Sequence, residues 1–207
     1  MHWPPCREGD AIGNLASPAL SLGTLLADYD IEAIVETGVG HGGSMKHALS
    51  LGRPLVYFGC DCDPEAIRIC KEMVPNAILS QTDSVSFLRN LLAEPQPFAM
   101  PALWFLDAHF GAHEDAWPLL AELDLIAACK PNVDRDVIVV DDIRCIADEA
   151  NPRYWPGELG APYVRSEHAW AEYTAPFIKT HTVHVRLEDE GYLLLLPRIT
   201  GAERGPQ

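Results

Sequence analysis

The chain has 207 residues, of which 48% are hydrophobic and 22% are charged, a composition typical of one globular domain with a sizeable core. It contains 15 basic and 30 acidic residues, a formal net charge of −15. Because this charge repels phosphate backbones and anionic lipids, we expect neither a nucleic-acid partner nor a membrane partner. No apolar stretch of about 18 residues is present. The first residues lack the pattern of a signal peptide, which predicts a cytoplasmic protein.

The first half of the chain alternates short apolar runs with longer helical patterns, which indicates βαβ units around a parallel sheet. The runs predict strands at 31–36, 55–61 and 77–80, and helices at 44–51, 64–73 and 84–92. Pro64 suits the first turn of its helix, where a missing N–H costs nothing. Asp83 or Ser84 is expected to cap the next helix.

The second half predicts strands at 102–107 and 136–141, with a helix at 114–129 between them. One stripe of that helix is apolar and comprises Leu119, Leu120, Leu123 and Ile126. The run at 137–140 is continuously apolar, as in a strand buried on both faces. After a loop and a helix at 167–177, strands at 181–187 and 192–196 form a hairpin, so one terminal strand should run antiparallel. The predicted fold is α/β, a Rossmann-like three-layer sandwich with a mostly parallel seven-stranded sheet.

Six cysteines are present, and none forms a CxxC pair. Cys60 and Cys62 flank Asp61 on one predicted strand, where neighbouring thiols rarely form a disulfide. We therefore expect reduced, mostly buried thiols in place of disulfides, and a zinc site would need better spaced ligands.

A glycine-rich loop follows the first predicted strand and opens a helix. Gly38, Gly40 and Gly43 satisfy the GxGxxG pattern of dinucleotide-binding loops, and Asp61 follows at a suitable distance. Glycines let the backbone turn sharply and approach a ligand closely. The loop alone does not choose between NAD and S-adenosylmethionine (SAM), and a purely structural turn is the third alternative.

Three features favour SAM. Glu36 ends the first strand, where a carboxylate would help to bind a cationic ligand and would repel a pyrophosphate. The single predicted domain, residues 1–207, has no separate half for hydride transfer. The predicted order of elements ends in the β-hairpin described above.

The segment Glu36-Thr37-Gly38-Val39-Gly40 resembles the first motif of the class I SAM-dependent methyltransferase family, and the resemblance extends over about 31–196. It implies that the loop holds the methionine part of SAM, with contacts from Glu36, Gly38, Gly40, Gly42 and Ser44.

The same resemblance implies that Asp61 binds the ribose hydroxyls. Asp63 is the competing residue, although it is better placed to cap the helix that begins at Pro64. Asp83 is similar in position to the adenine-contacting residue, with helix capping as an equal alternative.

Three acids follow the fourth and fifth predicted strands, namely Asp107, Asp141 and Asp142. The carboxyl ends of neighbouring parallel strands meet at the edge where ligands bind. Carboxylates that converge there repel one another unless a cation neutralises them, and oxygen ligands suit Mg²⁺, Mn²⁺ or Ca²⁺. In the alternative without metal, Asp141 or Asp142 caps a helix and Asp107 faces the cofactor.

This acidic set resembles that of metal-dependent small-molecule O-methyltransferases, which implies a divalent ion, such as Mg²⁺, that binds the acceptor and lowers the pKa of its hydroxyl. The catechol-type enzymes carry a lysine three residues after the first acid, whereas this chain has Phe110. His109 is the nearest titratable group and is expected to act with Asp107 in catalysis, as the base or as a metal ligand.

The sequence therefore predicts a SAM-dependent methyltransferase that acts on a hydroxyl of a small molecule, with help from a divalent ion. The alternatives are a metal-independent N- or C-methyltransferase, a non-catalytic SAM-binding module and an NAD-dependent oxidoreductase. Aromatic residues at 151–165 suggest an acceptor loop. Residues 1–25 are a candidate lid or support for a homo-oligomer.

Overall fold

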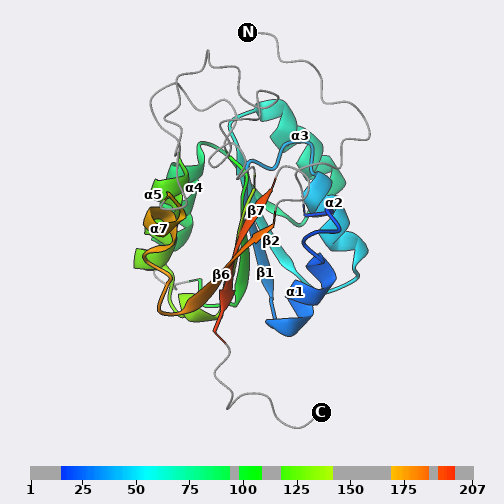
Figure 1. Cartoon of the computed structure of the whole chain (residues 1–207). Helices are drawn as coiled ribbons and strands as arrows, with labels where there is room; N and C mark the ends of the chain where they lie inside the picture. Colours follow the sequence, from blue (N-terminus) through cyan, green and yellow to red (C-terminus); the bar gives the residue numbers. More distant parts are fainter. Residues whose placement is uncertain (1–14, 94–97, 109–117, 142–168, 187–190, 199–207) are drawn as a thin grey trace.

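A computed structural model describes residues 15–93, 98–108, 118–141, 169–186 and 191–198 (Figure 1). His109, Asp142, residues 1–14 of the predicted lid and the predicted acceptor loop at 151–165 lie outside the described residues. None of the described helices is long and apolar enough to cross a membrane.

The described chain forms a seven-stranded sheet in the order β3-β2-β1-β4-β5-β7-β6. The strands are β1 Ala33–Thr37, β2 Val56–Asp61, β3 Ile78–Gln81, β4 Ala102–Leu106, β5 Val137–Val140, β6 His181–Arg186 and β7 Tyr192–Pro197. The first five pair in parallel, and β7 runs antiparallel to both β5 and β6. This confirms the predicted mostly parallel sheet with a terminal antiparallel hairpin. The strand ends differ from the predicted ones by at most two residues.

The helices form two layers that enclose the sheet, as Figure 1 shows. One layer contains α1 Leu22–Asp28, α2 Gly43–Ser50 and α3 Pro64–Met73, and the other contains α4 Ser84–Leu92, α5 Leu119–Cys129 and α7 Ala169–Thr174. A short 3₁₀ turn, η1 Val133–Arg135, precedes β5. Alternate residues of each inner strand point to opposite faces. In β1, Ile34 therefore joins the core beneath α1–α3, and Val35 joins the core beneath α4, α5 and α7.

Local sequence signals explain where α3 and α4 begin. The Asp63 side chain accepts a hydrogen bond from the Glu65 N–H at 2.9 Å, with Pro64 in the first turn. Asp83 accepts one from the Ser86 N–H at 2.8 Å. Each carboxylate satisfies a helix N–H group that has no partner within its helix. Both caps are those that the sequence predicts.

Two features depart from the sequence prediction. Helix α1 begins within the candidate lid segment, residues 1–25, and its Leu22, Leu25 and Leu26 are buried in the core beneath α1–α3. On α5, Leu120 is only half-buried, and Glu122 occupies the buried stripe beside Leu119, Leu123 and Ile126. A carboxyl group at a core position was not expected, since charged residues are almost never fully buried.

Candidate functional site

The glycine loop leaves β1 at the point where the sheet order changes direction. From β1, the chain continues to β2 and β3 on one side of the sheet and then crosses to β4 on the other. In open α/β sheets, ligands bind outside the carboxyl ends of the strands at such a switch point. The loop of residues 38–42 therefore lies where the fold places a cofactor.

Gly38 is required at its position for two reasons. Its φ of +79° is in the region that side chains rarely adopt, and a Cβ there would lie 2.5 Å from the Asp107 carbonyl oxygen. The Gly38 and Val39 N–H groups both donate to the Cys60 carbonyl, at 2.9 and 3.0 Å. The loop is thus held between the ends of β2 and β4.

Gly40 differs from Gly38 because its surroundings are open. Its φ is +48°, and a Cβ there would meet nothing within 4 Å. Its N–H donates to Asp61 Oδ2 at 2.9 Å. Gly40 is exposed, so its α-carbon leaves space above the sheet edge for a ligand.

Asp61 holds the loop from the end of β2. Its Oδ2 accepts the Gly40 N–H, and its Oδ1 accepts the Asp63 N–H at 2.9 Å. A carboxylate oxygen can accept more than one hydrogen bond, so the half-exposed Asp61 retains acceptor capacity for the two hydroxyls of a ribose. Asp63, the competing residue, is the cap of α3.

Glu36 is turned into the protein interior. It is 1% exposed, and the Tyr57 hydroxyl donates to its carboxyl group. Burial raises its pKa to about 8, although the hydrogen bonds from Tyr57 and Ser44 oppose this rise. The uncharged form therefore predominates at neutral pH, where Glu36 offers a cationic ligand little of the negative charge that the sequence predicts. A contact between Glu36 and a cofactor stays a prediction.

Ser44 and Asp83 also have internal partners. Ser44 is buried, and its hydroxyl accepts the Leu15 N–H at 3.2 Å. The bond that Asp83 accepts from the Ser86 N–H lowers the pKa of the Asp83 carboxyl. The Thr82 N–H donates to the Asp61 carbonyl at 3.0 Å, so the segment after β3 lies beside the end of β2. Contacts of these residues, and of Gly42, with a cofactor stay predictions.

Two of the three predicted metal acids are described, and they lie on neighbouring strand ends. Leu106 of β4 pairs with Val140 of β5, so the next residues, Asp107 and Asp141, follow the paired positions. The Asp141 N–H donates to the Leu106 carbonyl at 3.1 Å. Asp141 is 0% exposed and Asp107 is half-buried. Among the described residues, no group of three His, Cys, Asp or Glu side chains could hold a metal ion.

Sequence reasoning missed Tyr57 and Glu122. Tyr57 belongs to a strand whose neighbours are apolar, and Glu122 belongs to an apolar helical stripe. A polar group at a position that the period assigns to the core was the available signal for both. The four described cysteines are free thiols, of which Cys60 and Cys70 are buried and Cys62 and Cys129 are exposed, so half of them depart from the predicted burial.

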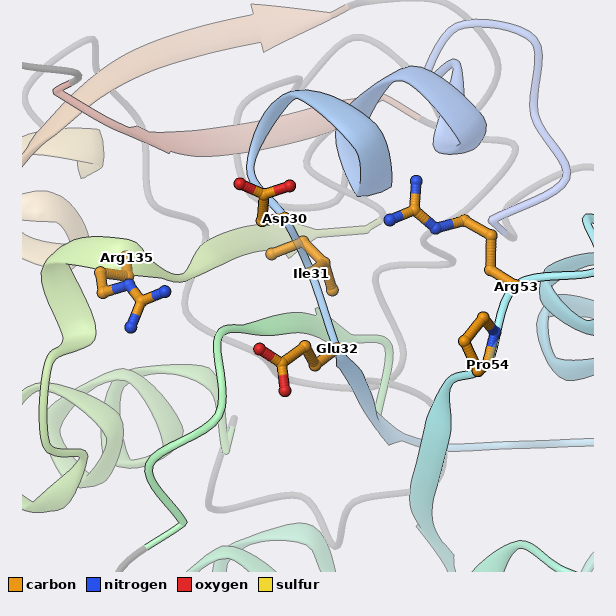
Figure 2. Close-up of a pocket in the computed structure, with 6 residues that line it drawn as sticks. All are labelled: Asp30, Ile31, Glu32, Arg53, Pro54 and Arg135. Carbon is orange, nitrogen blue, oxygen red and sulfur yellow. The ribbon is translucent and has the colours of Figure 1, made fainter. Parts of the chain in front are cut away.

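A recess of about 460 Å³ lies at the opposite end of the sheet (Figure 2). Its lining precedes β1, β2 and β5 and comprises Asp30, Ile31, Glu32, Arg53, Pro54 and Arg135. These residues belong to the amino-terminal edge of the strands, whereas ligands of this architecture bind at the carboxyl edge. We therefore do not assign the cofactor to this recess.

No protein-family model and no curated protein matches the chain. Solved structures do match it. An O-methyltransferase from Bacillus cereus in complex with SAH has a TM-score of 0.59 at 15% identity, over 88% of this chain and 82% of its own. DesVI from Streptomyces venezuelae has a TM-score of 0.57 at 12% identity, over 89% of this chain and 92% of DesVI. The N-methyltransferase NodS from Bradyrhizobium japonicum WM9 has a TM-score of 0.52 at 17% identity, over 86% of this chain and 92% of NodS.

The chain therefore has the Rossmann-like methyltransferase fold. The seven-stranded sheet with its antiparallel β6–β7 hairpin is the arrangement of this fold. Identities of 12–17% establish the fold alone, because one fold can host unrelated functions.

Proposed function

We propose that the chain is a SAM-dependent methyltransferase that transfers a methyl group to a hydroxyl of a small molecule. The observation that carries the proposal is the loop of residues 38–42, fixed at the switch point by Asp61 and open at Gly40. A loop of this shape, in a methyltransferase fold, provides close backbone approach and a carboxylate for a ribose.

SAM supplies an electrophilic methyl group, so the protein has to bind the cofactor, align the acceptor and remove a proton. In this proposal Asp61 binds the ribose, and the segment at Asp83 lies against the adenine. Asp107, at the end of β4, faces the reacting part of the cofactor. His109 is the proposed base.

A divalent ion is the second part of the proposal. Asp107 and Asp141 follow adjacent strand ends, and Asp142 follows Asp141 in the sequence. In this proposal the three carboxylates would hold Mg²⁺ or Mn²⁺, ions that prefer oxygen ligands, and the ion would lower the pKa of the acceptor hydroxyl.

Metal-independent N-methylation is the competing function. One observation favours it: the N-methyltransferase NodS shares the fold. A requirement for metal separates the two functions.

Cofactor binding tests the first part. We expect S-adenosylhomocysteine (SAH) to raise the melting temperature and NAD⁺ and NADP⁺ to leave it unchanged; a ligand at 100 times its Kd stabilises by about 2.7 kcal/mol. Stabilisation by NAD⁺ without any by SAH would exclude the proposal.

A pair of glycine variants locates the binding site. Gly40 and Gly52 both have positive φ, +48° and +67°, and a Cβ on either meets nothing within 4 Å. Gly40→Ala and Gly52→Ala therefore carry similar backbone strain, but only Gly40 lies in the proposed cofactor loop. We expect Gly40→Ala alone to weaken SAH binding. Equal SAH affinities of the two variants would mean that the cofactor does not bind at this loop.

Chelation tests the second part. With any acceptor found in a screen of phenols, sugars and amines, EDTA should abolish turnover and Mg²⁺ should restore it, while SAH still binds. Asp141→Asn should reduce turnover far more than SAH affinity. Full turnover in EDTA would favour the metal-independent function.

A further inference from the structure

A buried carboxyl group lies beneath the proposed cofactor site, on the side of the sheet that α4 and α5 cover. Glu122 is in the first turn of α5 and is 0% exposed. The hydroxyl groups of Thr37 and Ser84 lie close enough to the carboxyl to lower its pKa. In the described part of the chain, however, neither Glu122 oxygen nor Thr37 Oγ1 completes a hydrogen bond of good geometry.

The two hydroxyl groups belong to segments that the proposed function uses. Thr37 is the last residue of β1 and directly precedes Gly38, whereas Ser84 is the first residue of α4 and directly follows Asp83. One carboxyl group therefore lies near both the start of the glycine loop and the start of the helix that follows the proposed adenine segment. A change in the position of the Glu122 carboxyl group would therefore affect both the glycine loop and the start of α4.

The protonation state of Glu122 decides which hydrogen bonds its carboxyl group can make. A protonated carboxyl group donates one hydrogen bond and accepts others, so it can bridge two hydroxyl groups, whereas a carboxylate only accepts. An ionised carboxylate at full burial also carries a large desolvation penalty. Burial raises the pKa of Glu122 to about 7, against the effect of the Ser84 and Thr37 hydroxyls, so both forms are accessible near neutrality.

No described cation compensates this carboxyl group. Burial raises the pKa of the Cys60 thiol on β2 far above neutrality. The exposed charged groups of α4 and α5 are Arg89 and Asp124. Further titratable groups on the surrounding elements are Asp107 after β4, Asp141 after β5, Glu172 and Tyr173 on α7 and, on the opposite face of β1, Glu36.

We infer that Glu122 is a positioning residue whose protonated form holds the end of β1 and the start of α4 in the arrangement that binds SAM, and whose deprotonation weakens that binding. This inference rests on the proposed function. The inference adds to the proposed function that cofactor affinity depends on pH through a residue buried beneath the site.

The test is SAH affinity measured by calorimetry between pH 6 and pH 8.5. If only the protein molecules with protonated Glu122 bind SAH tightly, the Kd of the unmodified protein should rise by up to about thirtyfold over this range. Glu122→Gln stays neutral and keeps a donor and an acceptor. Its Kd for SAH should therefore rise much less between pH 6 and pH 8.5 than that of the unmodified protein.

Asp124→Asn is the matched control, because it removes an exposed carboxylate from the same helix. It should keep the pH dependence of the unmodified protein. Glu36 is present in all three proteins, so its titration cancels in the comparison. A Kd that is independent of pH in the unmodified protein, or equally dependent in Glu122→Gln, would overturn the inference.

Proton uptake provides a measurement that does not need the variant to fold. At pH 8, SAH binding to the unmodified protein should take up a proton, detected as a binding enthalpy that depends on the ionisation enthalpy of the buffer. Binding without proton uptake would overturn the role of Glu122 and leave the proposed function intact. Absence of SAH binding at pH 6 would instead contradict the proposed function.

Discussion

At the scale of single residues, the candidate site depends on which carboxyl groups receive backbone N–H groups. Asp61 receives those of Gly40 and Asp63, one on each oxygen. Asp63 receives that of Glu65 within its own helix. Two acids separated by one residue thus have different tasks: Asp61 ties the glycine loop to β2, and Asp63 begins α3.

This difference can be tested by removing each carboxylate. Asp61→Ala should weaken SAH binding by about 1.5–3 kcal/mol, the scale of a hydrogen bond to a charged group. Asp63→Ala should leave SAH affinity nearly unchanged and lower the free energy of unfolding by about 1 kcal/mol, because it removes a helix cap. Calorimetry and chemical denaturation measure the two effects. The reverse pattern would assign the ribose to Asp63.

Glu36 predicts a pH dependence of stability. Its folded pKa is about 8 against an ordinary value of 4.5, so the folded state binds this proton more tightly than the unfolded state. The associated stability is complete below pH 4.5 and is lost as the pH rises to about 8, at about 1.4 kcal/mol per pH unit at full effect.

Glu36→Gln should therefore flatten this decline. The free energy of unfolding, from denaturant titrations at pH 5 and pH 8, should fall less in the variant than in the unmodified protein. Glu122 contributes to the same decline up to about pH 7, so a double variant with Glu122→Gln should be flatter still. Parallel profiles for the unmodified protein and Glu36→Gln would mean that Glu36 is not buried as described.

At the scale of elements, a buried ion pair connects the end of α5 to the start of β5. Lys130 Nζ lies 3.3 Å from Asp136 Oδ2, and both side chains are 0% exposed. Asp136 also accepts the Ala102 N–H at 3.0 Å and the Trp104 Nε1–H at 2.8 Å. One carboxylate therefore joins α5, β4 and β5 at the edge of the sheet away from the cofactor loop.

Removal of the lysine should be costly because it leaves a buried carboxylate without its cation. Lys130→Met should lower the free energy of unfolding by about 3–5 kcal/mol at pH 8. The loss should be smaller at acid pH, because burial already raises the pKa of Asp136 to about 6 and protonation removes the unpaired charge. Denaturation at both pH values measures this difference.

Arg68→Ala is the control for this prediction. Arg68 pairs with Glu65 and Glu72 on the exposed face of α3, where water already solvates the charges. The free energy of unfolding should hardly change. An equally small effect of Lys130→Met would show that the interior pair does not hold these elements together.

At the scale of the whole molecule, the net charge of −15 should destabilise the folded state through self-repulsion. Raising NaCl from 0.01 to 0.15 M shortens the Debye length from about 30 to about 8 Å. The melting temperature should therefore rise with NaCl, without any ligand. A rise produced only by Mg²⁺ at constant ionic strength would instead point to a specific ion site.

The sequence by itself determined the features that depend on residues close together in the chain. The alternating pattern predicted βαβ units, Asp63 and Asp83 predicted two helix starts, and positive φ at Gly38 agrees with the predicted tight turn. The terminal hairpin predicted the antiparallel strand. These features could be predicted because a cap, a turn or an amphipathic period acts within one element.

Only the tertiary structure decided which polar groups lie inside. Glu36 meets Tyr57 from another strand, Glu122 lies against β1 and α4, and Lys130 pairs with Asp136 across α5 and β5. A carboxyl group in a sequence favours the surface, because burial without a partner is costly. Whether a partner is present depends on how distant segments pack, and that arrangement is set by the assembled sheet and its two helical layers.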